Sequence, residues 1–588
     1  VFALAAYWTN QQNAAADAGL ITCLQDELYL EDGINQFRKD AYLLARIFML
    51  FSSQSDFFPG RMSTAAEDAV LEMLWDWAEP CNLDVADVAK VNWSIGTENH
   101  HSRTVVGLWT AAHIFKDHPS YQNLNYADGA TQAQMAAAFD DYFKAYVRER
   151  IRQGLCVEIA SPSYAQVTVT PWYNLSDFAE DPELKEAVDM LLNIYWADWA
   201  MEQIDGVRGG SRHRSYVGTN SQKESGGDRM AWYSFGLGVE ANPHPGVMCA
   251  ATTFWRPERV VVGLTLDVDG RGSYGSLSRR PGLADPSPQT TPPVFHDPAN
   301  NAIAPDGGSL LRYTWCTPDF VMGMSQVEAR PNDDWLANSA QNRWNGVIFA
   351  GHPTARIYGR PEPEPGRRVL NGEWGVQHKG VMILQQLTEA FRATGQKLWF
   401  DASLTRQEMN GWVFAEAPQA YAAVKVVTGG WSWQTDTLGD FLVLNDRYSP
   451  IILEVGRKQD YADMNAFKTE IQANPILWDG QRLDYGSTGH GTVLTHFADE
   501  SGSPWVDGVP LNYSPDKTFD SPYLWEECAG GPVIIEHGNV RKVYGVAPFA
   551  DDTGTEGMWH FEAALQDGSG TYYEDDTSVT ARPPREAR

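Results

Sequence analysis

The period of the hydrophobic pattern changes along this chain, and the change divides it into a helical part and a β-rich part. Before residue 277, apolar residues recur at helical spacing, as in "QMAAAFDDYFKAYVRERIRQG" and "DPELKEAVDMLLNIYWADWAMEQIDG". The second segment has Asp181 as a candidate N-cap, Pro182 in the first turn and Gly206 after its end. We therefore predict long amphipathic helices in residues 1–277, packed as antiparallel pairs.

Three more segments of this part have helical features. The stretch "DGINQFRKDAYLLARIFMLF" places its apolar residues near helical spacing. In "STAAEDAVLEMLWDWAE", Thr64 and Glu67 form the pattern of a capping box. Residues 245–267 are predicted to form one further helix.

Short β-rich runs separated by turn residues fill the chain after residue 310. Examples are "LLRYTWCTPDFVMGMSQVEA" and "GPVIIEHGNVRKVYGV". Their regular spacing predicts an antiparallel sandwich over residues 310–575. Residues 278–309 are rich in Pro, Asp, Asn and Gly, which indicates a linker or long loop, and residues 576–588 form a polar tail. At 588 residues the chain is too long for one ordinary core, so we predict an α+β multidomain protein.

Charge and cysteine content exclude several classes of function. The formal net charge of −31 argues against nucleic acid and anionic membrane surfaces as partners, since both require a basic surface. No apolar run reaches the roughly 18 residues that span a bilayer. The six cysteines are scattered and form no CxxC pair, which argues against a zinc finger or a dense disulfide framework. The opening "VFALAAYW" lacks a methionine, so we expect a processed or truncated chain. We predict a secreted or periplasmic location.

The aromatic content suggests carbohydrate. The chain has 22 Trp and 24 Tyr, which are flat side chains with one polar group each. Sugar rings stack on such faces. Large helical and β-sandwich cores also consume aromatic residues, so composition alone leaves both explanations open.

The stretch "TENHHSR" gathers polar groups where a helix is about to begin. Asn99, His100, His101 and Arg103 lie within it, and the apolar segment "TVVGLWTAAHIF" follows. Because adjacent residues do not share a helix face, the two histidines are expected to have different roles. The alternative is that Asn99 caps the helix and the histidines are structural.

Two further polar clusters are candidates for function. One is "EIASPSY", a turn-forming stretch from Glu158 to Tyr164. The other is the glycine-rich segment "GVRGGSRHRSYVG", which contains four basic residues and a tyrosine: Arg208, Arg212, His213, Arg214 and Tyr216. Guanidinium groups bind carboxylates or sulfates through paired hydrogen bonds, so this segment suits an anionic ligand. The alternative is a loop paired with the protein's own acidic residues.

The pair Asn99-His100 followed by Tyr164 resembles a group of polysaccharide lyases. These enzymes, which include alginate lyases and heparinase-like enzymes, combine an incomplete (α/α) toroid with antiparallel β-sandwiches. The resemblance implies that fold, and it implies that Asn99, His100 and Tyr164 are catalytic. Substrate contacts are then expected from nearby polar residues: His101, Arg103, Glu158, Arg212, His213, Arg214 and Tyr216. Some relatives have Asn-Asn-His, or an arginine just before the tyrosine; here the nearest preceding one is Arg152.

The chemistry of such a lyase explains these residue types. It removes the proton on C5 of a uronate, expels the oxygen on C4 and leaves an unsaturated uronate. Asn99, helped by a cation, would neutralise the carboxylate through hydrogen bonds. His100, of a residue type with a reference pKa near 6.5, suits the base, and Tyr164 suits the acid or, beside cations, the base. No cofactor or metal is expected, and the sequence has neither a Walker loop nor HExxH.

Two alternatives remain open from the sequence. The first is a glycoside hydrolase on an (α/α) toroid, which needs two carboxylates roughly 5–10 Å apart. Its candidate acids are Glu98, Glu158, Asp177 and Asp198. The second is a non-catalytic carbohydrate-binding protein. The identity of the sugar, the mode of attack and the oligomeric state are not determined by the sequence.

Overall fold

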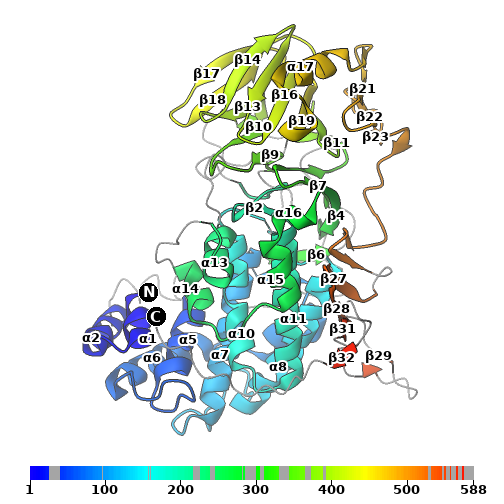
Figure 1. Cartoon of the computed structure of the whole chain (residues 1–588). Helices are drawn as coiled ribbons and strands as arrows, with labels where there is room; N and C mark the ends of the chain where they lie inside the picture. Colours follow the sequence, from blue (N-terminus) through cyan, green and yellow to red (C-terminus); the bar gives the residue numbers. More distant parts are fainter. Residues whose placement is uncertain are drawn as a thin grey trace.

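The computed structural model describes most of the chain, with a helical N-terminal part and a β-rich C-terminal part (Figure 1). The residues that it describes are 1–25, 40–95, 97–156, 158, 160–215, 226–238, 245–280, 282–284, 300–304, 310–329, 343–363, 372–388, 393–526, 531–545, 549–550, 556–557, 564–566 and 572–574. The predicted α+β class and the order of the two parts are confirmed. None of the helices in these ranges combines the length and apolar character that a bilayer span requires.

The helices of the first part pack side by side around a shared apolar core. Helices α5, α7, α8, α11 and α15 contact one another in that succession. The helices are α1 (Phe2–Thr9), α2 (Asn13–Leu24), α5 (Ala41–Phe51), α6 (Thr64–Ala78), α7 (Glu98–Asp117), α8 (Gln132–Arg152), α9 (Ala165–Val169), α10 (Trp172–Phe178), α11 (Pro182–Glu202), α13 (Gly226–Phe235), α14 (Pro245–Thr252), α15 (Arg259–Leu266) and α16 (Val268–Arg271).

Helices α8 and α11 form where the sequence predicts them. The side chain of Asp181 accepts a hydrogen bond from the Glu183 N–H, and Pro182 occupies the first turn of α11. Helix α8 ends just before Gly154 and buries the six apolar residues expected on one face: Met135, Phe139, Tyr142, Phe143, Tyr146 and Val147.

Two details of the helix predictions are wrong. Ser63 rather than Thr64 caps α6, and Glu67 accepts hydrogen bonds from Ser53 instead of completing a capping box. Residues 245–267 form two helices, α14 and α15, rather than one. Pro257 lies between them; because its ring lacks an N–H and restricts the preceding residue, it interrupts the helical path.

Two antiparallel sheets face each other in the β part and enclose an apolar core. The nine-stranded sheet has the order β17 (Trp431–Thr435), β18 (Gly439–Leu444), β13 (Ala393–Asp401), β10 (Arg356–Pro363), β9 (Gly346–Phe349), β8 (Phe320–Gln326), β7 (Leu310–Cys316), β4 (Tyr274–Arg280) and β25 (Phe519–Asp520). The six-stranded sheet has the order β11 (Glu373–His378), β12 (Val381–Gln386), β19 (Ile451–Arg457), β16 (Ala420–Val426), β15 (Trp412–Glu416) and β14 (Thr405–Met409).

Smaller sheets complete this part. Helix α17 (Met464–Ala473) precedes a sheet of β20 (Ile476–Trp478), β21 (Arg482–Ser487), β22 (Thr492–Phe497), β23 (Trp505–Val506) and β24 (Val509–Pro510). A three-stranded sheet consists of β26 (Leu524–Glu526), β27 (Val533–His537) and β28 (Val540–Tyr544). Three further sheets are two-stranded: β2 (Gln203–Ile204) with β3 (Val207–Arg208), β29 (Phe549–Ala550) with β30 (Glu556–Gly557), and β31 (Ala564–Gln566) with β32 (Tyr572–Glu574).

The segment between the two parts is not simply a linker. Strand β4 begins at Tyr274 and belongs to the large sheet, so the sandwich starts before the predicted boundary at residue 277. Strands β5 (Gly282–Ala284) and β6 (Asn300–Ala304) pair with each other, and β6 pairs with β1 (Trp93–Ile95) of the helical part. β5 and β6 form because they pair with each other and β6 pairs with the distant strand β1. Residue composition does not reveal such pairing.

The last strands return to the helical part. Strands β27 and β28 contact α15, and the Lys542 ammonium lies 3.3 Å from the Glu258 carboxylate. The Tyr523 hydroxyl donates a hydrogen bond of 2.6 Å to the carbonyl of Arg271. The two parts therefore contact each other at these last strands as well as where the chain passes from one part to the other. The predicted tail at 576–588 lies outside the described residues.

A buried carboxyl in the sandwich predicts a pH effect on stability. Glu454 is buried and accepts hydrogen bonds from Ser487 at 2.6 Å and from Tyr485; burial raises its pKa to about 7. The folded state therefore holds this proton more tightly than the unfolded chain, so its contribution to stability is lost as pH rises through about 7. Calorimetry should show the Tm of Glu454→Gln gaining on the wild type between about pH 5 and about pH 8. A constant difference would contradict this assignment.

Candidate functional site

The first turn of α7 carries the Asn-His-His stretch. The helix begins at Glu98, earlier than the start near Ser102 that the sequence suggests, so Asn99, His100 and His101 are helical. Asn99 does not cap the helix; its Nδ2 donates a hydrogen bond of 2.9 Å to Thr97 Oγ1. The three side chains consequently have fixed directions, about 100° apart around the helix axis.

A line of contacts joins Asn99 to Tyr164. The second N–H of Asn99 donates a hydrogen bond of 2.8 Å to Glu158 Oε2, and Arg214 forms an ion pair with Glu158 Oε1. The guanidinium carbon of Arg214 lies 3.8 Å from the centre of the Tyr164 ring. We call these four residues, Asn99, Glu158, Arg214 and Tyr164, the Asn–Tyr cluster. It brings together all three of the polar stretches found in the sequence.

The charges of the Asn–Tyr cluster are buried and paired. Glu158 is 0% exposed and Arg214 is 8% exposed. The Glu158 N–H donates a hydrogen bond of 2.9 Å to Glu98, whose other oxygen lies 3.7 Å from Arg150. Removing one partner of a buried ion pair leaves an uncompensated charge, so this arrangement holds its members firmly in place.

The backbone around the Asn–Tyr cluster is strained. Arg214 has a φ of 49° and Ala160 a φ of 61°, a left-handed conformation that residues with a Cβ adopt rarely. Tyr164 is half-buried, immediately precedes α9, and donates its N–H to Ser161 Oγ at 3.1 Å. Such strain persists only where surrounding contacts enforce it, and it is concentrated at functional sites in proteins.

The two adjacent histidines differ in their surroundings. His101 is buried; its Nδ1 accepts the Ile95 N–H at 3.3 Å, and its Nε2 lies 2.8 Å from the Tyr142 hydroxyl. Because Nδ1 accepts, Nε2 carries the proton, and burial lowers the pKa of His101 to about 3. His100 is half-buried. The two imidazoles therefore lie in different environments, one buried and one half-buried.

The remaining predicted site residues lie elsewhere. Arg103 pairs with Asp40 at 3.0 Å. Arg212 is 1% exposed and stacks on the Trp344 ring at 4.9 Å; burial lowers its pKa to about 9. His213 is buried against the β part, with Nε2 2.8 Å from Ser325 Oγ. Tyr216 lies outside the described residues.

Four predictions of substrate contact need correction on this geometry. The side chains concerned are buried and contact protein groups in this conformation: His101, Glu158, Arg212 and His213. The basic residues from Arg212 to Arg214 were predicted to contact an anionic ligand together. Instead, Arg214 reaches the Asn–Tyr cluster, while Arg212 and His213 are covered by the β part.

Comparison with known proteins adds distant likenesses in structure and none in sequence. No family model matches the chain, and no curated protein matches it by sequence. Among solved structures, the chain is similar to a chondroitinase AC lyase studied as enzyme–oligosaccharide complexes, with 8% identity and a TM-score of 0.37. The match covers 91% of this chain and 81% of the other. At this level of similarity, functional residues have to be judged from contacts within this chain.

The carboxylates proposed for a glycoside hydrolase each contact a different arginine. Asp177 pairs with Arg46 at 2.7 Å and Asp198 with Arg208 at 2.5 Å, and all four groups are buried. Glu98 and Glu158 have their own arginines, as described above. Paired acids that flank a glycosidic bond must reach the substrate, so this arrangement does not favour a hydrolase. Within the described ranges, His, Cys, Asp and Glu side chains form no group of three suited to a metal ion.

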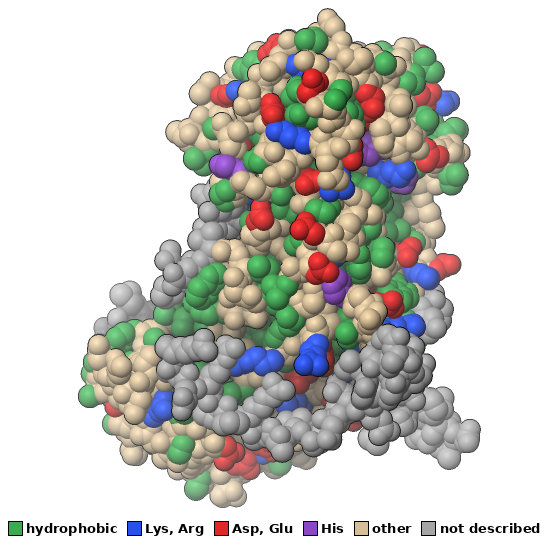
Figure 2. Space-filling model, in the orientation of Figure 1, with side chains coloured by type: hydrophobic (Ala, Val, Ile, Leu, Met, Phe, Trp, Pro, Cys, Tyr) green, Lys and Arg blue, Asp and Glu red, His purple; other side chains and the backbone are tan. Residues whose placement is uncertain are grey.

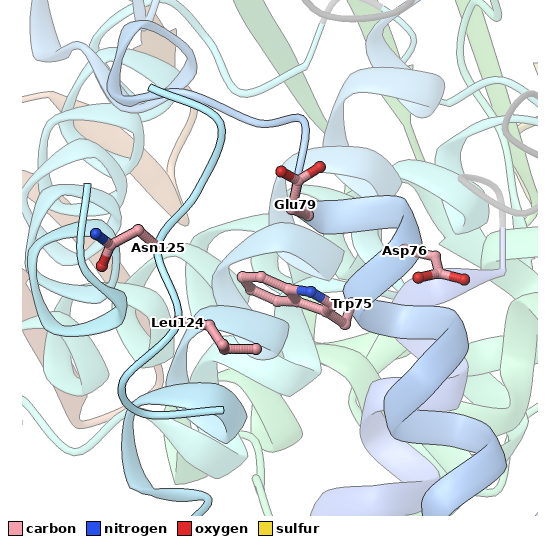
Figure 3. A pocket seen from close by; sticks show the side chains of 5 residues that line it. All are labelled: Trp75, Asp76, Glu79, Leu124 and Asn125. Atoms are coloured by element: carbon pink, nitrogen blue, oxygen red, sulfur yellow. The ribbon is translucent and has the colours of Figure 1, made fainter. Parts of the chain in front are cut away.

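A surface hollow elsewhere in the helical part has a different character. It is lined by Trp75, Asp76, Glu79, Leu124 and Asn125, with a volume of about 400 Å³ (Figure 3). The Trp75 ring packs on Phe115 near the far end of α7, about 24 Å along the helix from Asn99 at 1.5 Å per residue. With two carboxylates and no basic group in its lining, the hollow does not suit an anionic polymer.

Proposed function

We propose that this protein is a polysaccharide lyase that cleaves a uronate-containing polymer by β-elimination. The observation that carries the proposal is the Asn–Tyr cluster. In it, an amide and a guanidinium converge on one carboxylate beside a half-buried phenol, and the half-buried His100 adjoins the amide on α7. These are the groups that elimination from a uronate requires: a base, an acid and donors for the carboxylate.

In the proposed reaction, His100 takes the proton from C5 of the uronate. The electron pair of the broken C–H bond forms a double bond between C4 and C5, and the bond from C4 to the glycosidic oxygen breaks. Tyr164 gives its hydroxyl proton to that oxygen. Negative charge that develops on the uronate carboxylate is stabilised by hydrogen bonds from Asn99 and Arg214.

The contact with Glu158 supports the role of these donors. Asn99 and Arg214 already hold a carboxylate, that of Glu158, through one amide hydrogen and one guanidinium nitrogen. Both amide hydrogens of Asn99 are engaged, with Thr97 and Glu158, and the residue is 2% exposed. We therefore propose that the uronate carboxylate shares these donors with Glu158 when substrate binds, so that the buried Glu158–Arg214 ion pair is retained.

The expected partner is an acidic polysaccharide or oligosaccharide. Acidic and basic side chains are interspersed over the described part of the face in Figure 2, without a broad basic area. Recognition of a polyanion would therefore depend on a few placed donors such as Arg214 rather than on the overall charge of −31. A secreted or periplasmic location is part of the proposal, since polymers of this kind lie outside the cytoplasm.

The proposal is tested by mixing the protein with a panel of uronic polysaccharides. Alginate, glucuronan, ulvan, a rhamnose–glucuronate polymer and glycosaminoglycans cover the main classes. We expect ultraviolet absorbance to rise with at least one polymer, because elimination creates a conjugated double bond. New reducing ends without absorbance would indicate a hydrolase, and binding without cleavage would indicate a carbohydrate-binding protein. Either result would contradict the lyase assignment.

A further inference from the structure

Residues 209–215, which we call the arginine loop, pack directly on strand β8. Alternate residues of β8 face opposite sides: Phe320, Met322 and Met324 enter the sandwich core, whereas Ser325 contacts the arginine loop. The backbones of β8 and the arginine loop come close together at Gly323 and Gly210. A Cβ on Gly323 would lie 2.4 Å from Gly210 Cα, so the backbone of β8 and the backbone of the loop touch there.

Ser325 is the centre of the hydrogen bonds between the two. Its Oγ donates to Ser211 Oγ at 2.9 Å and lies 2.8 Å from His213 Nε2. Its N–H donates to Asn345 Oδ1 at 2.8 Å. These four residues are buried. One hydroxyl therefore fixes the loop at two positions, of which His213 immediately precedes Arg214.

The hydrogen bonds continue into the sandwich. Asn345 Nδ2 donates to Glu373 Oε1 at 2.7 Å, and Gln396 Nε2 donates to the other oxygen of Glu373 at 2.6 Å. Because Asn345 uses its oxygen for Ser325 and its nitrogen for Glu373, its amide cannot rotate without losing a bond. The position of Ser325 is thus fixed by buried groups from β11 and β13.

A second set of bonds links the loop to strand β7 and, through Arg312 of that strand, to the helical part. Arg312 Nε donates to the Ser211 carbonyl at 3.0 Å, and its Nη2 donates to Glu202 at 2.7 Å. Glu202 is the last residue of α11. Ser211 is therefore held by β7 and β8, and the β7 residue that holds it is in turn bonded to the end of α11.

We propose that Ser325 is a positioning residue for the active site, acting through Ser211 and His213 on Arg214. The proposal rests on the lyase function proposed above. Arg214 stacks on Tyr164 with a left-handed backbone, a conformation that neighbouring contacts must enforce. Ser325 supplies such contacts from the β part, so the sandwich takes part in catalysis by keeping Arg214 in place.

The test is a double-mutant cycle in the full-length chain. Ser325→Ala, Arg214→Ala and the double variant are assayed on the polymer that the wild type cleaves. We expect Ser325→Ala to lower kcat about tenfold with KM changed less than about twofold, because the substrate contacts remain and only their placement is lost. In the Arg214→Ala background, Ser325→Ala should have almost no further effect on kcat. Ser325→Thr, which retains a hydroxyl, should recover part of the loss.

Ser487→Ala is the matched control. Like Ser325, Ser487 is a buried serine of the β part. Its hydroxyl donates a hydrogen bond to the buried Glu454 on β19. This variant should lower Tm and leave kcat unchanged. Equal losses of kcat in the two serine variants, or a full loss from Ser325→Ala in the Arg214→Ala background, would show that Ser325 is merely structural and overturn the proposal.

Hydrogen exchange separates failure of this proposal from failure of the proposed function. Peptides that cover residues 209–215 should exchange faster in Ser325→Ala than in the wild type or in Ser487→Ala, whatever the substrate. Unchanged exchange would overturn the positioning role even in an active enzyme. If no polymer is cleaved but exchange is faster in Ser325→Ala, the lyase function is overturned, and the role of Ser325 in catalysis is overturned with it. The contact between Ser325 and the arginine loop would then be structural only.

Discussion

Replacement of Tyr164 by phenylalanine is expected to lower kcat by about a hundredfold or more while the protein stays folded. The hydroxyl is the group that we propose protonates the leaving oxygen, and phenylalanine lacks it. The aromatic ring remains, so Arg214 keeps the face on which it stacks. Because the side chain is half-buried and precedes a short helix, loss of one hydroxyl should change Tm little.

Tyr121→Phe provides the control for this variant. Tyr121 is also a half-buried tyrosine of the helical part, but its ring packs on Phe115 and Trp75, at the far end of α7. Initial rates from ultraviolet absorbance and melting curves from circular dichroism should be measured for both variants. Near-wild-type turnover in Tyr164→Phe would remove Tyr164 from the mechanism, and the acid would then have to be sought elsewhere around the Asn–Tyr cluster.

The predictable part of the fold is the part that local sequence determines. Helix α11 has its cap, its first-turn proline and its apolar face within one segment, and it forms as expected. Strand β6 has no such local pattern; its pairing with β1 depends on a partner some two hundred residues earlier. The break between α14 and α15 also has a local signal, since Pro257 lies inside the single helix predicted for residues 245–267.

The sequence marks the members of the Asn–Tyr cluster as candidates, but it does not show the contacts between them. The resemblance pointed to Asn99 and Tyr164, and Arg214 was singled out as an unusual cation. Their connection through Glu158 spans 56 residues between Glu158 and Arg214, a distance over which sequence carries no geometric information. In an extended segment, Arg212 and Arg214 would lie on the same side. The left-handed backbone at Arg214 and the packing of Arg212 on Trp344 separate them, and both are tertiary effects.

Substitution of the two neighbouring histidines should have different effects: loss of His101 should lower stability, and loss of His100 should lower kcat. His101 is held between Ile95 and Tyr142, and its removal leaves buried polar groups without partners. His101→Ala should therefore reduce the free energy of unfolding by about 1–3 kcal/mol. Its effect on kcat per folded molecule should be small. The sequence alone suggested a loss of substrate affinity for this variant; the burial of His101 replaces that expectation with a loss of stability.

His100→Ala should show the opposite behaviour, with kcat lowered about a hundredfold and Tm nearly unchanged, since a general base contributes roughly that factor. The pH dependence of stability distinguishes the two further. The pKa of His101 is lowered to about 3 in the folded protein, whereas a histidine in the unfolded chain binds a proton below about pH 6.5. Because the unfolded chain then binds more protons, the free energy of unfolding decreases as pH falls from about 6.5 to about 3. That contribution should be absent from His101→Ala and retained in His100→Ala. Should His101→Ala abolish turnover in a folded protein while His100→Ala stays active, the base would be His101, reached only after its bonds to Ile95 and Tyr142 open.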